Sequence, residues 1–92
     1  MGSEDRANWL DGNGVAGLLA EVFGAEVTAV VRGCGSCGAE AAVGAHRAYR
    51  GAGTVLRCPV CGDLAARIAT LPDRHVVRLA GTWLIEVPRA GQ

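Results

Sequence analysis

The first regular pattern of apolar residues in the chain has the period of an α-helix. Apolar side chains recur at i, i+3, i+4, i+7 and i+8, at positions Val15, Leu18, Leu19, Val22 and Phe23. This spacing places them on one face of a helix. Asp11 or Asn13 can cap the start of that helix, and Gly24 is placed to end it. The pattern therefore predicts an N-terminal helix over about 12–23.

After Glu26 the pattern changes to short apolar runs of β-strand length, separated by turn residues. The segments 51–53 and 71–74 have the composition of turns, and Gly44 is a candidate for a β-bulge. The predicted strands are 27–32, 41–50, 54–58, 63–71, 75–80 and 82–87. We therefore predict a small α+β fold in which the helix packs on an antiparallel sheet of about 4–6 short strands.

The chain of 92 residues is long enough for one small domain. We assign 9–87 to this domain, with the helix at about 12–23, a sheet region at about 26–87, and flexible tails at 1–8 and 88–92. The apolar face of the helix is expected to pack on the sheet against Val27, Ile68, Leu79 and Ile85. Domains of this size often need a metal, a disulfide or a partner chain to be stable.

All four cysteines lie in two matched pieces, CGSCG at 34–38 and CPVCG at 58–62. The pattern C-x2-C-x20-C-x2-C is typical of a four-thiolate metal site, because each C-x2-C turn points two sulfur atoms the same way. The glycine after each pair can adopt the left-handed conformation that closes such a turn. The predicted metal is Zn²⁺ and its predicted ligands are Cys34, Cys37, Cys58 and Cys61.

Disulfide bonds and a redox-active C-x2-C motif, two other uses of paired cysteines, are less consistent with the sequence. The N-terminal segment is acidic and polar, unlike a secretory signal, and no stretch has the about 20 apolar residues of a membrane span. We therefore expect a cytoplasmic protein without membrane contact, whose thiols stay reduced, which disfavours two disulfides. A redox-active C-x2-C would begin a helix, whereas both pairs here lie between predicted strands.

The two cysteine pieces resemble the knuckles of zinc ribbons, over about residues 27–70. The resemblance implies a site built on β-hairpins, with the same four cysteines as ligands. The combination of LDGNGVAGLLAEVFG, the first knuckle and YRGAGTVLRCPVCG is similar to an uncharacterised family of short bacterial zinc-ribbon proteins, over residues 10–87. That likeness implies no established activity. The knuckles also resemble those that hold iron in rubredoxins, so Fe and a rubredoxin-like electron carrier stay open as alternatives.

The formal net charge is zero, but acids and bases are segregated along the chain. Residues 1–26 carry five acids and one base, and residues 27–92 carry eight arginines and four acids. The arginines around the predicted strands can contact phosphates; they are Arg32, Arg47, Arg50, Arg57, Arg67 and Arg78. A four-thiolate zinc centre carries about −2 and offsets some of this charge. Since Tyr49 is the one aromatic residue within the ribbon, nucleic-acid binding is an alternative that we do not favour.

The remaining residues do not form a recognisable catalytic group. A four-thiolate zinc site has no open position for water or substrate, and such sites are structural. His46 and His75 match no ligand position, so we expect ordinary surface or half-buried strand residues there. We therefore predict a protein that is not an enzyme, and whose most consistent role is a protein-interaction module with another protein as its partner.

Overall fold

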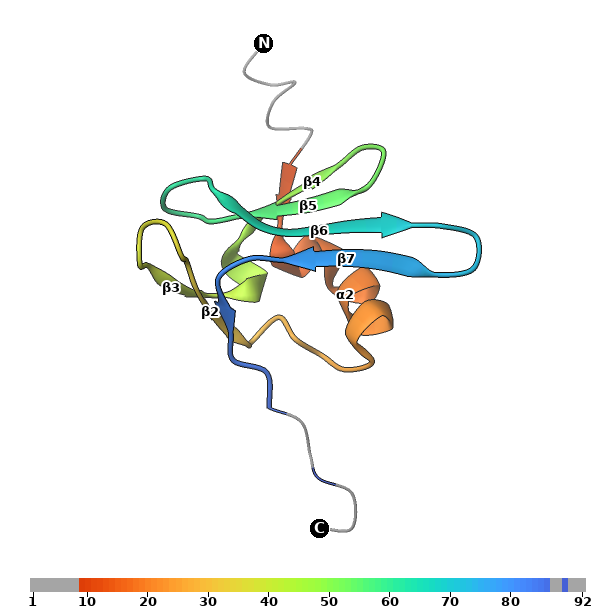
Figure 1. The fold of residues 1–92 in the computed structure, drawn as a ribbon, viewed down its shortest axis with the longest axis horizontal. Helices are drawn as coiled ribbons and strands as arrows, with labels where there is room; N and C mark the ends of the chain where they lie inside the picture. Colours follow the sequence, from red (N-terminus) through yellow and green to blue (C-terminus); the bar gives the residue numbers. More distant parts are fainter. Residues whose placement is uncertain (1–8, 87–88, 90–92) are drawn as a thin grey trace.

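A computed structural model of the chain describes residues 9–86 and 89 (Figure 1). The helical elements are η1 (Gly12–Val15), α2 (Ala16–Phe23) and η2 (Val43–Ala45), where η marks a 3-10 helix. The strands are β1 (Trp9–Asp11), β2 (Val31–Gly33), β3 (Glu40–Ala42), β4 (Arg47–Arg50), β5 (Thr54–Arg57), β6 (Leu64–Thr70), β7 (His75–Leu79) and β8 (Thr82–Trp83). The predicted tails 1–8 and 88–92 lie outside the described residues, apart from Arg89.

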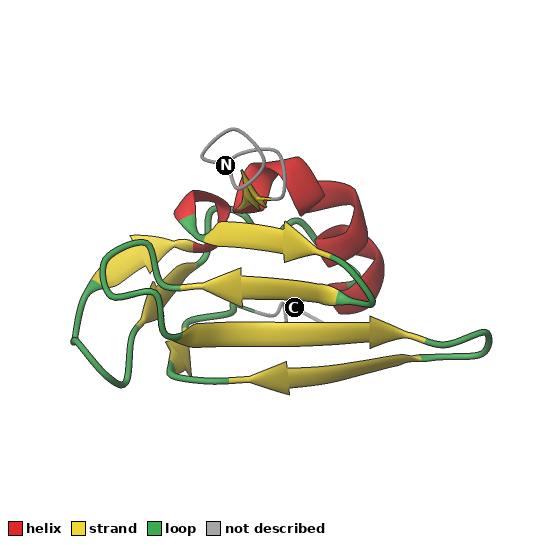
Figure 2. Cartoon of the chain, turned by 90° about the horizontal axis from the view of Figure 1, so that it is seen from above, coloured by secondary structure: helices red, strands yellow, loops and turns green. Residues whose placement is uncertain are grey.

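The strands form two antiparallel sheets. The larger sheet has the order β1-β4-β5-β6-β7, and the smaller has the order β3-β2-β8. Figure 2 shows the strands of the larger sheet side by side, with the helix to one side of them. The predicted α+β class, with an N-terminal helix on an antiparallel sheet, is confirmed. The five strands of the larger sheet match the predicted number, and the smaller sheet adds three short strands.

The predicted helix over 12–23 is confirmed, with its first turn in the 3-10 form. The Asp11 carboxylate accepts a hydrogen bond from the Gly14 N–H at 3.0 Å, as the cap prediction requires. Gly24 ends the helix in the left-handed conformation, with φ of 71°, and its N–H donates to the Ala20 carbonyl at 2.8 Å. None of the helices within the described residues is long and apolar enough to cross a membrane.

The hydrophobic core lies between this helix and the inner face of the larger sheet. Leu19, Leu56 and Ile68 are buried there with at most 1% of their surface exposed. Phe23 at the end of the helix stacks on Trp83 of the smaller sheet, with ring centroids 5.9 Å apart. The helix therefore packs on both sheets, while the larger sheet supplies most of the core.

Two of the four predicted contacts of the helix are wrong. Val27 and Ile68 belong to the core, as expected. Leu79 is 42% exposed and Ile85 is 36% exposed. Leu79 ends the outermost strand of the larger sheet, and Ile85 follows the two-residue strand β8, so neither position lies under the helix.

The predicted strands at 27–32 and 82–87 are much shorter than expected. Val30 N–H donates to the Val27 carbonyl at 3.0 Å, which makes a turn of the first four residues, and β2 begins only at Val31. The last strand stops at Trp83. Val27 lies in the core and Val30 and Trp83 pack against it, whereas Val31, Leu84 and Ile85 are exposed. Periodicity alone does not separate these cases.

The predicted strand at 41–50 is two strands that belong to different sheets. The turn η2 divides it, so Gly44 lies in a 3-10 helix and not in a β-bulge. At this turn η2 packs closely on η1, because a Cβ atom on Gly12 would overlap the Val43 carbonyl oxygen. The register irregularity of the larger sheet lies elsewhere, between Leu56 and Arg57 on β5, where β6 has one extra residue.

Arg32 on β2 is 2% exposed, so the prediction of a solvent-facing arginine that can contact phosphate is wrong. Its Nε donates to the Ala80 carbonyl at 2.9 Å, and its Nη2 donates to the Leu64 carbonyl at 3.3 Å. These two acceptors belong to the chain after β7 and to the start of β6. Arg32 therefore links the smaller sheet to the larger one, and residues far along the chain bury it.

His46 is also buried, with 1% exposed, where a surface or half-buried residue was predicted. Its Nδ1 lies 2.9 Å from the Ala42 carbonyl, which can only accept, so Nδ1 carries the hydrogen. Its Nε2 lies 3.4 Å from Nη1 of Arg32, which can only donate. Burial and the Arg32 charge lower the pKa of His46 and outweigh the opposite effect of the bond to Ala42. The fold therefore holds the neutral imidazole.

We predict that stability decreases as the pH falls below about 6.5, the pKa of an unfolded histidine. The pKa of His46 is lowered in the folded state, so the unfolded chain binds more protons in this range. The free energy of unfolding should then fall by up to about 1.4 kcal/mol per pH unit, down to the folded pKa. Denaturant titrations of metal-loaded protein between about pH 7.5 and about pH 5.5 measure this slope. His46→Asn should flatten this slope; an equal slope in the wild type and in His46→Asn contradicts the assignment.

Candidate metal centre

The two cysteine pieces form turns of the same geometry. Cys34 to Gly38 joins β2 to β3, and Cys58 to Gly62 joins β5 to β6. In the first turn the Gly38 N–H donates to the Cys34 carbonyl at 3.0 Å, and in the second the Gly62 N–H donates to the Cys58 carbonyl at 2.9 Å. Both glycines have φ of 79°, the left-handed conformation predicted from the sequence. Each hairpin therefore presents two cysteines from one tight turn.

The four sulfur atoms converge, although their two hairpins belong to different sheets. All four lie within 4.8 Å of one another, with Cys34 Sγ 3.7 Å from Cys61 Sγ and Cys37 Sγ 3.8 Å from Cys58 Sγ. The cysteines are free, and these separations are far from the about 2.05 Å of a disulfide. A tetrahedron with Zn–S bonds of about 2.3 Å has edges of about 3.8 Å. Two of the six sulfur separations match this edge, and the four cysteines could hold one metal ion.

Backbone N–H groups point at the sulfur atoms, as thiolate ligands require. The N–H groups of Ser36 and Val60 lie 3.4 Å from the sulfur atoms of Cys34 and Cys58, so the two knuckles use the same contact. Hydrogen bonds of this kind stabilise the negative sulfur. Backbone donors from the knuckle lower the pKa of Cys34 to about 6 and also lower the pKa of Cys58.

The crowding of four sulfur atoms opposes ionisation of the Cys61 thiol. Asp63 N–H, 3.4 Å from Cys61 Sγ, acts to lower the pKa of Cys61. Burial and the contacts with the other three sulfur atoms act in the opposite direction and raise this pKa to about 12. Four adjacent thiolates repel one another, so a divalent cation among them removes the main cost of the arrangement.

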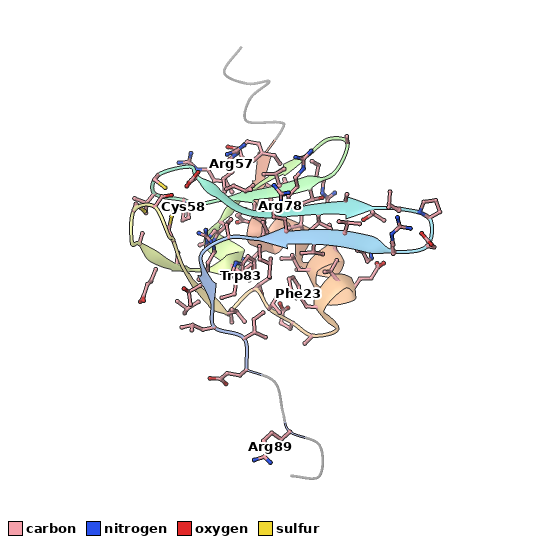
Figure 3. All side chains as sticks on the ribbon, viewed as in Figure 1. Phe23, Arg57, Cys58, Arg78, Trp83 and Arg89 are labelled. Carbon is pink, nitrogen blue, oxygen red and sulfur yellow. The ribbon has the colours of Figure 1, made fainter. Side chains whose placement is uncertain are left out.

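A hydrogen bond between the Ser36 hydroxyl and the Asp63 carboxylate joins the two knuckles directly. The Ser36 bond is the largest cause that lowers the pKa of Asp63, and the charges of Arg57 and Arg32 lower it further. The Arg57 guanidinium also donates to the Gly62 carbonyl at 3.1 Å. Figure 3 shows Arg57 at the same end of the sheet as Cys58. We call the hydrogen bond between Ser36 and Asp63 the clasp. It was not predicted from the sequence, although the hydroxyl of Ser36 inside one knuckle and the carboxylate of Asp63 directly after the other were available signals.

The two histidines lie outside the sulfur cluster, as predicted. Within the described part of the chain, the four cysteines form the one group of at least three metal-binding side chains. His46 is bound to Ala42 and Arg32, and Nε2 of His75 lies 2.9 Å from a carboxylate oxygen of Glu21 on the helix. Both imidazoles therefore have structural partners.

We predict that Ser36→Ala and Asp63→Asn each weaken metal binding by roughly 10-fold. Ser36→Ala removes the donor of the clasp, and Asp63→Asn replaces its charged acceptor by a weaker neutral one. Competition with a chromogenic chelator at constant pH measures this change. Asp73→Asn removes a carboxylate that pairs with Arg74 in the turn after β6, far along the chain from the knuckles, and serves as the control. Equal affinities in all three variants would show that the clasp has no part in metal binding.

Comparison with known proteins identifies a family for this chain. No curated protein and no solved structure matches it. One protein family, described as a family of unknown function (DUF6510), matches residues 4–90 and thus nearly the whole sequence. The chain therefore belongs to the DUF6510 family.

Proposed function

We propose that this protein is a non-catalytic interaction module in which one structural Zn²⁺ ion joins two sheets. The ligands are Cys34, Cys37, Cys58 and Cys61. The observation that carries the proposal is the sulfur separations of 3.7 and 3.8 Å, which match the edge of a tetrahedral Zn–S4 centre. Four thiolates complete the coordination shell and leave no position for water or a substrate, so the centre is structural and of the zinc-ribbon type.

The arrangement of the hairpins explains why a metal is needed. One pair of ligands lies in the hairpin of the smaller sheet and the other pair in the larger sheet. The smaller sheet has strands of three, three and two residues, too short for independent stability. A metal bound to both hairpins fixes the smaller sheet on the larger one. Since the ligands must be reduced thiols, the cytoplasm is the compartment that suits the protein.

Iron, as in a rubredoxin, is the alternative metal, because four thiolates suit both ions. The exposure of Cys37 and Cys61 favours it, since an electron carrier needs its centre near the surface. We prefer zinc because the neighbours of the cysteines in the two knuckles include Gly, Ser, Ala, Val and Asp, whereas aromatic residues surround the iron of rubredoxins.

We place the protein-binding surface on the smaller sheet. Val31, Leu84 and Ile85 are exposed there by 38%, 56% and 36%. Val31 and Leu84 line a hollow of about 440 Å³ together with Glu26 and Glu86. A hollow lined by apolar side chains and two carboxylates fits a partner protein segment that carries both apolar residues and Lys or Arg.

We predict that protein purified without a chelating resin contains one zinc per chain and has no visible colour. Metal analysis and an absorption spectrum test this directly; one iron with thiolate charge-transfer bands would overturn the zinc assignment.

Cys58→Ser should lose the metal and unfold, because structural zinc contributes about 10–16 kcal/mol in small finger peptides. If that variant kept the melting temperature of the wild type, the metal would not be structural.

We predict that Leu84→Glu abolishes capture of a specific partner protein, because it places a charge in the apolar part of the hollow. Leu71→Glu makes the same change at an exposed leucine in the turn after β6 and should leave capture unchanged. Direct titration of the purified partner should show that binding weakens with salt, since Glu26 and Glu86 face its basic residues. If both variants captured the partner protein equally well, the hollow would not be the protein-binding surface.

A further inference from the structure

The outer face of the larger sheet carries a row of four side chains that neither the metal centre nor the core uses. Strand pairing places Tyr49 opposite Val55, Val55 opposite Arg67, and Arg67 opposite Arg78. We call these four residues the outer row. The adjacent positions Ala48, Leu56 and Ala66 form the opposite, buried face, with at most 1% exposed. The outer row therefore points away from helix α2 and crosses four neighbouring strands, a span of about 14 Å.

Two arginines at directly paired positions are an unfavourable arrangement. Like charges opposite each other on neighbouring strands destabilise a sheet. Arg67 and Arg78 are both exposed, and among the described residues neither has a hydrogen bond or an ion pair. The exposed Arg74 instead pairs with Asp73, and Arg57 donates to a carbonyl. An anion bound between the two guanidinium groups would relieve the repulsion in the outer row.

The charge around the outer row is mainly positive. The sequences of β4, β5, β6 and β7 contain no acidic residue, and residues 47–79 contain six arginines and two acids. Figure 3 shows Arg57 and Arg78 on the side of the sheet away from Phe23 and Trp83, so the positive face and the helix-covered face are opposite. A field of this kind attracts a ligand with several negative charges.

The shape of this face adds a place for planar groups. A hollow of about 470 Å³ lies over Tyr49, Val55 and Arg67, and the small residues of the 51–53 turn leave it open. A second hollow of about 280 Å³ lies between Arg67, Val76 and Arg78. The two hollows share Arg67, so an aromatic ring, apolar side chains and two guanidinium groups line one continuous strip.

We propose that the outer row binds single-stranded nucleic acid, with phosphates at Arg67 and Arg78 and an unpaired base on Tyr49. Unpaired bases offer flat apolar faces to Tyr49, Val55 and Val76, whereas a duplex would present only its charged backbone to these side chains. Sheets that bind single-stranded RNA use exposed aromatic residues in this way and stack about two or three bases. Composition alone does not favour nucleic-acid binding, but the strand register places Tyr49 in one row with Arg67 and Arg78. This activity uses a different face from the proposed protein-binding hollow and does not depend on it.

Fluorescence anisotropy with labelled oligo(U) and oligo(dT) of about 12 nucleotides tests the proposal on the metal-loaded full chain. We expect binding that weakens between about 50 mM and about 200 mM salt. The double variant Arg67→Gln/Arg78→Gln should bind at least about 10-fold more weakly, and its log–log salt slope should be smaller by about 1.4, or 0.7 per lost phosphate contact. Tyr49→Leu should weaken binding roughly 5- to 100-fold and leave the salt slope unchanged, because stacking releases no counterions.

Arg74→Gln is the matched control, since it removes one exposed arginine outside the outer row. The proposal is overturned if neither oligonucleotide binds at low salt, or if Arg74→Gln weakens binding as much as Arg67→Gln does. It is also overturned if an abasic oligonucleotide or inorganic polyphosphate binds as tightly as oligo(U), which would indicate a phosphate site only. A dimer that dissociates in the Arg67→Gln/Arg78→Gln variant would instead assign the outer row to a second copy of the chain. Thermal melting confirms that each variant is folded.

Discussion

The convergence of four cysteine sulfur atoms from two hairpins is the constraint on which the rest of the structure depends. The hairpins belong to different sheets, so their relative position decides where the sheets meet. Each knuckle is locally rigid, because a left-handed glycine closes it and its backbone N–H groups point at sulfur. Bringing these two rigid turns together fixes the smaller sheet, whose strands of two or three residues have little core of their own.

A second junction between the sheets lies at Arg32, two residues before the first cysteine. The hydrogen bonds of this buried guanidinium go to the carbonyls of Leu64 and Ala80, and it faces the neutral His46. A buried cation is costly unless charge or hydrogen bonds compensate it. Its effect on the pKa of Asp63 shows that its field reaches the second knuckle. The proposed zinc centre would carry about −2, so this cation lies where an anionic centre needs one.

The segregation of charge along the chain becomes a segregation of surfaces in the fold. The basic residues between 47 and 79 lie on the strands and turns of the larger sheet, while Glu26 and Glu86 flank the hollow of the smaller sheet. Because the two sheets meet at the cysteine cluster and at Arg32, the acidic and basic faces have a fixed relative position. One small domain can in this way present two chemically different surfaces to two different partners.

The sequence by itself determined the local features. The helix over 12–23, its cap at Asp11, the left-handed glycines and the convergence of the cysteine knuckles depend on residues that are close in sequence or on the known chemistry of paired cysteines. Only the tertiary structure decided the burial of Arg32 and His46, the division of 41–50 between two sheets, and the exposure of Leu79 and Ile85. These depend on contacts between distant residues, such as Arg32 with Ala80 and the close approach of Gly12 to Val43. Periodicity reports which residues are apolar along a segment, but burial of a polar side chain is decided by what the rest of the chain places around it.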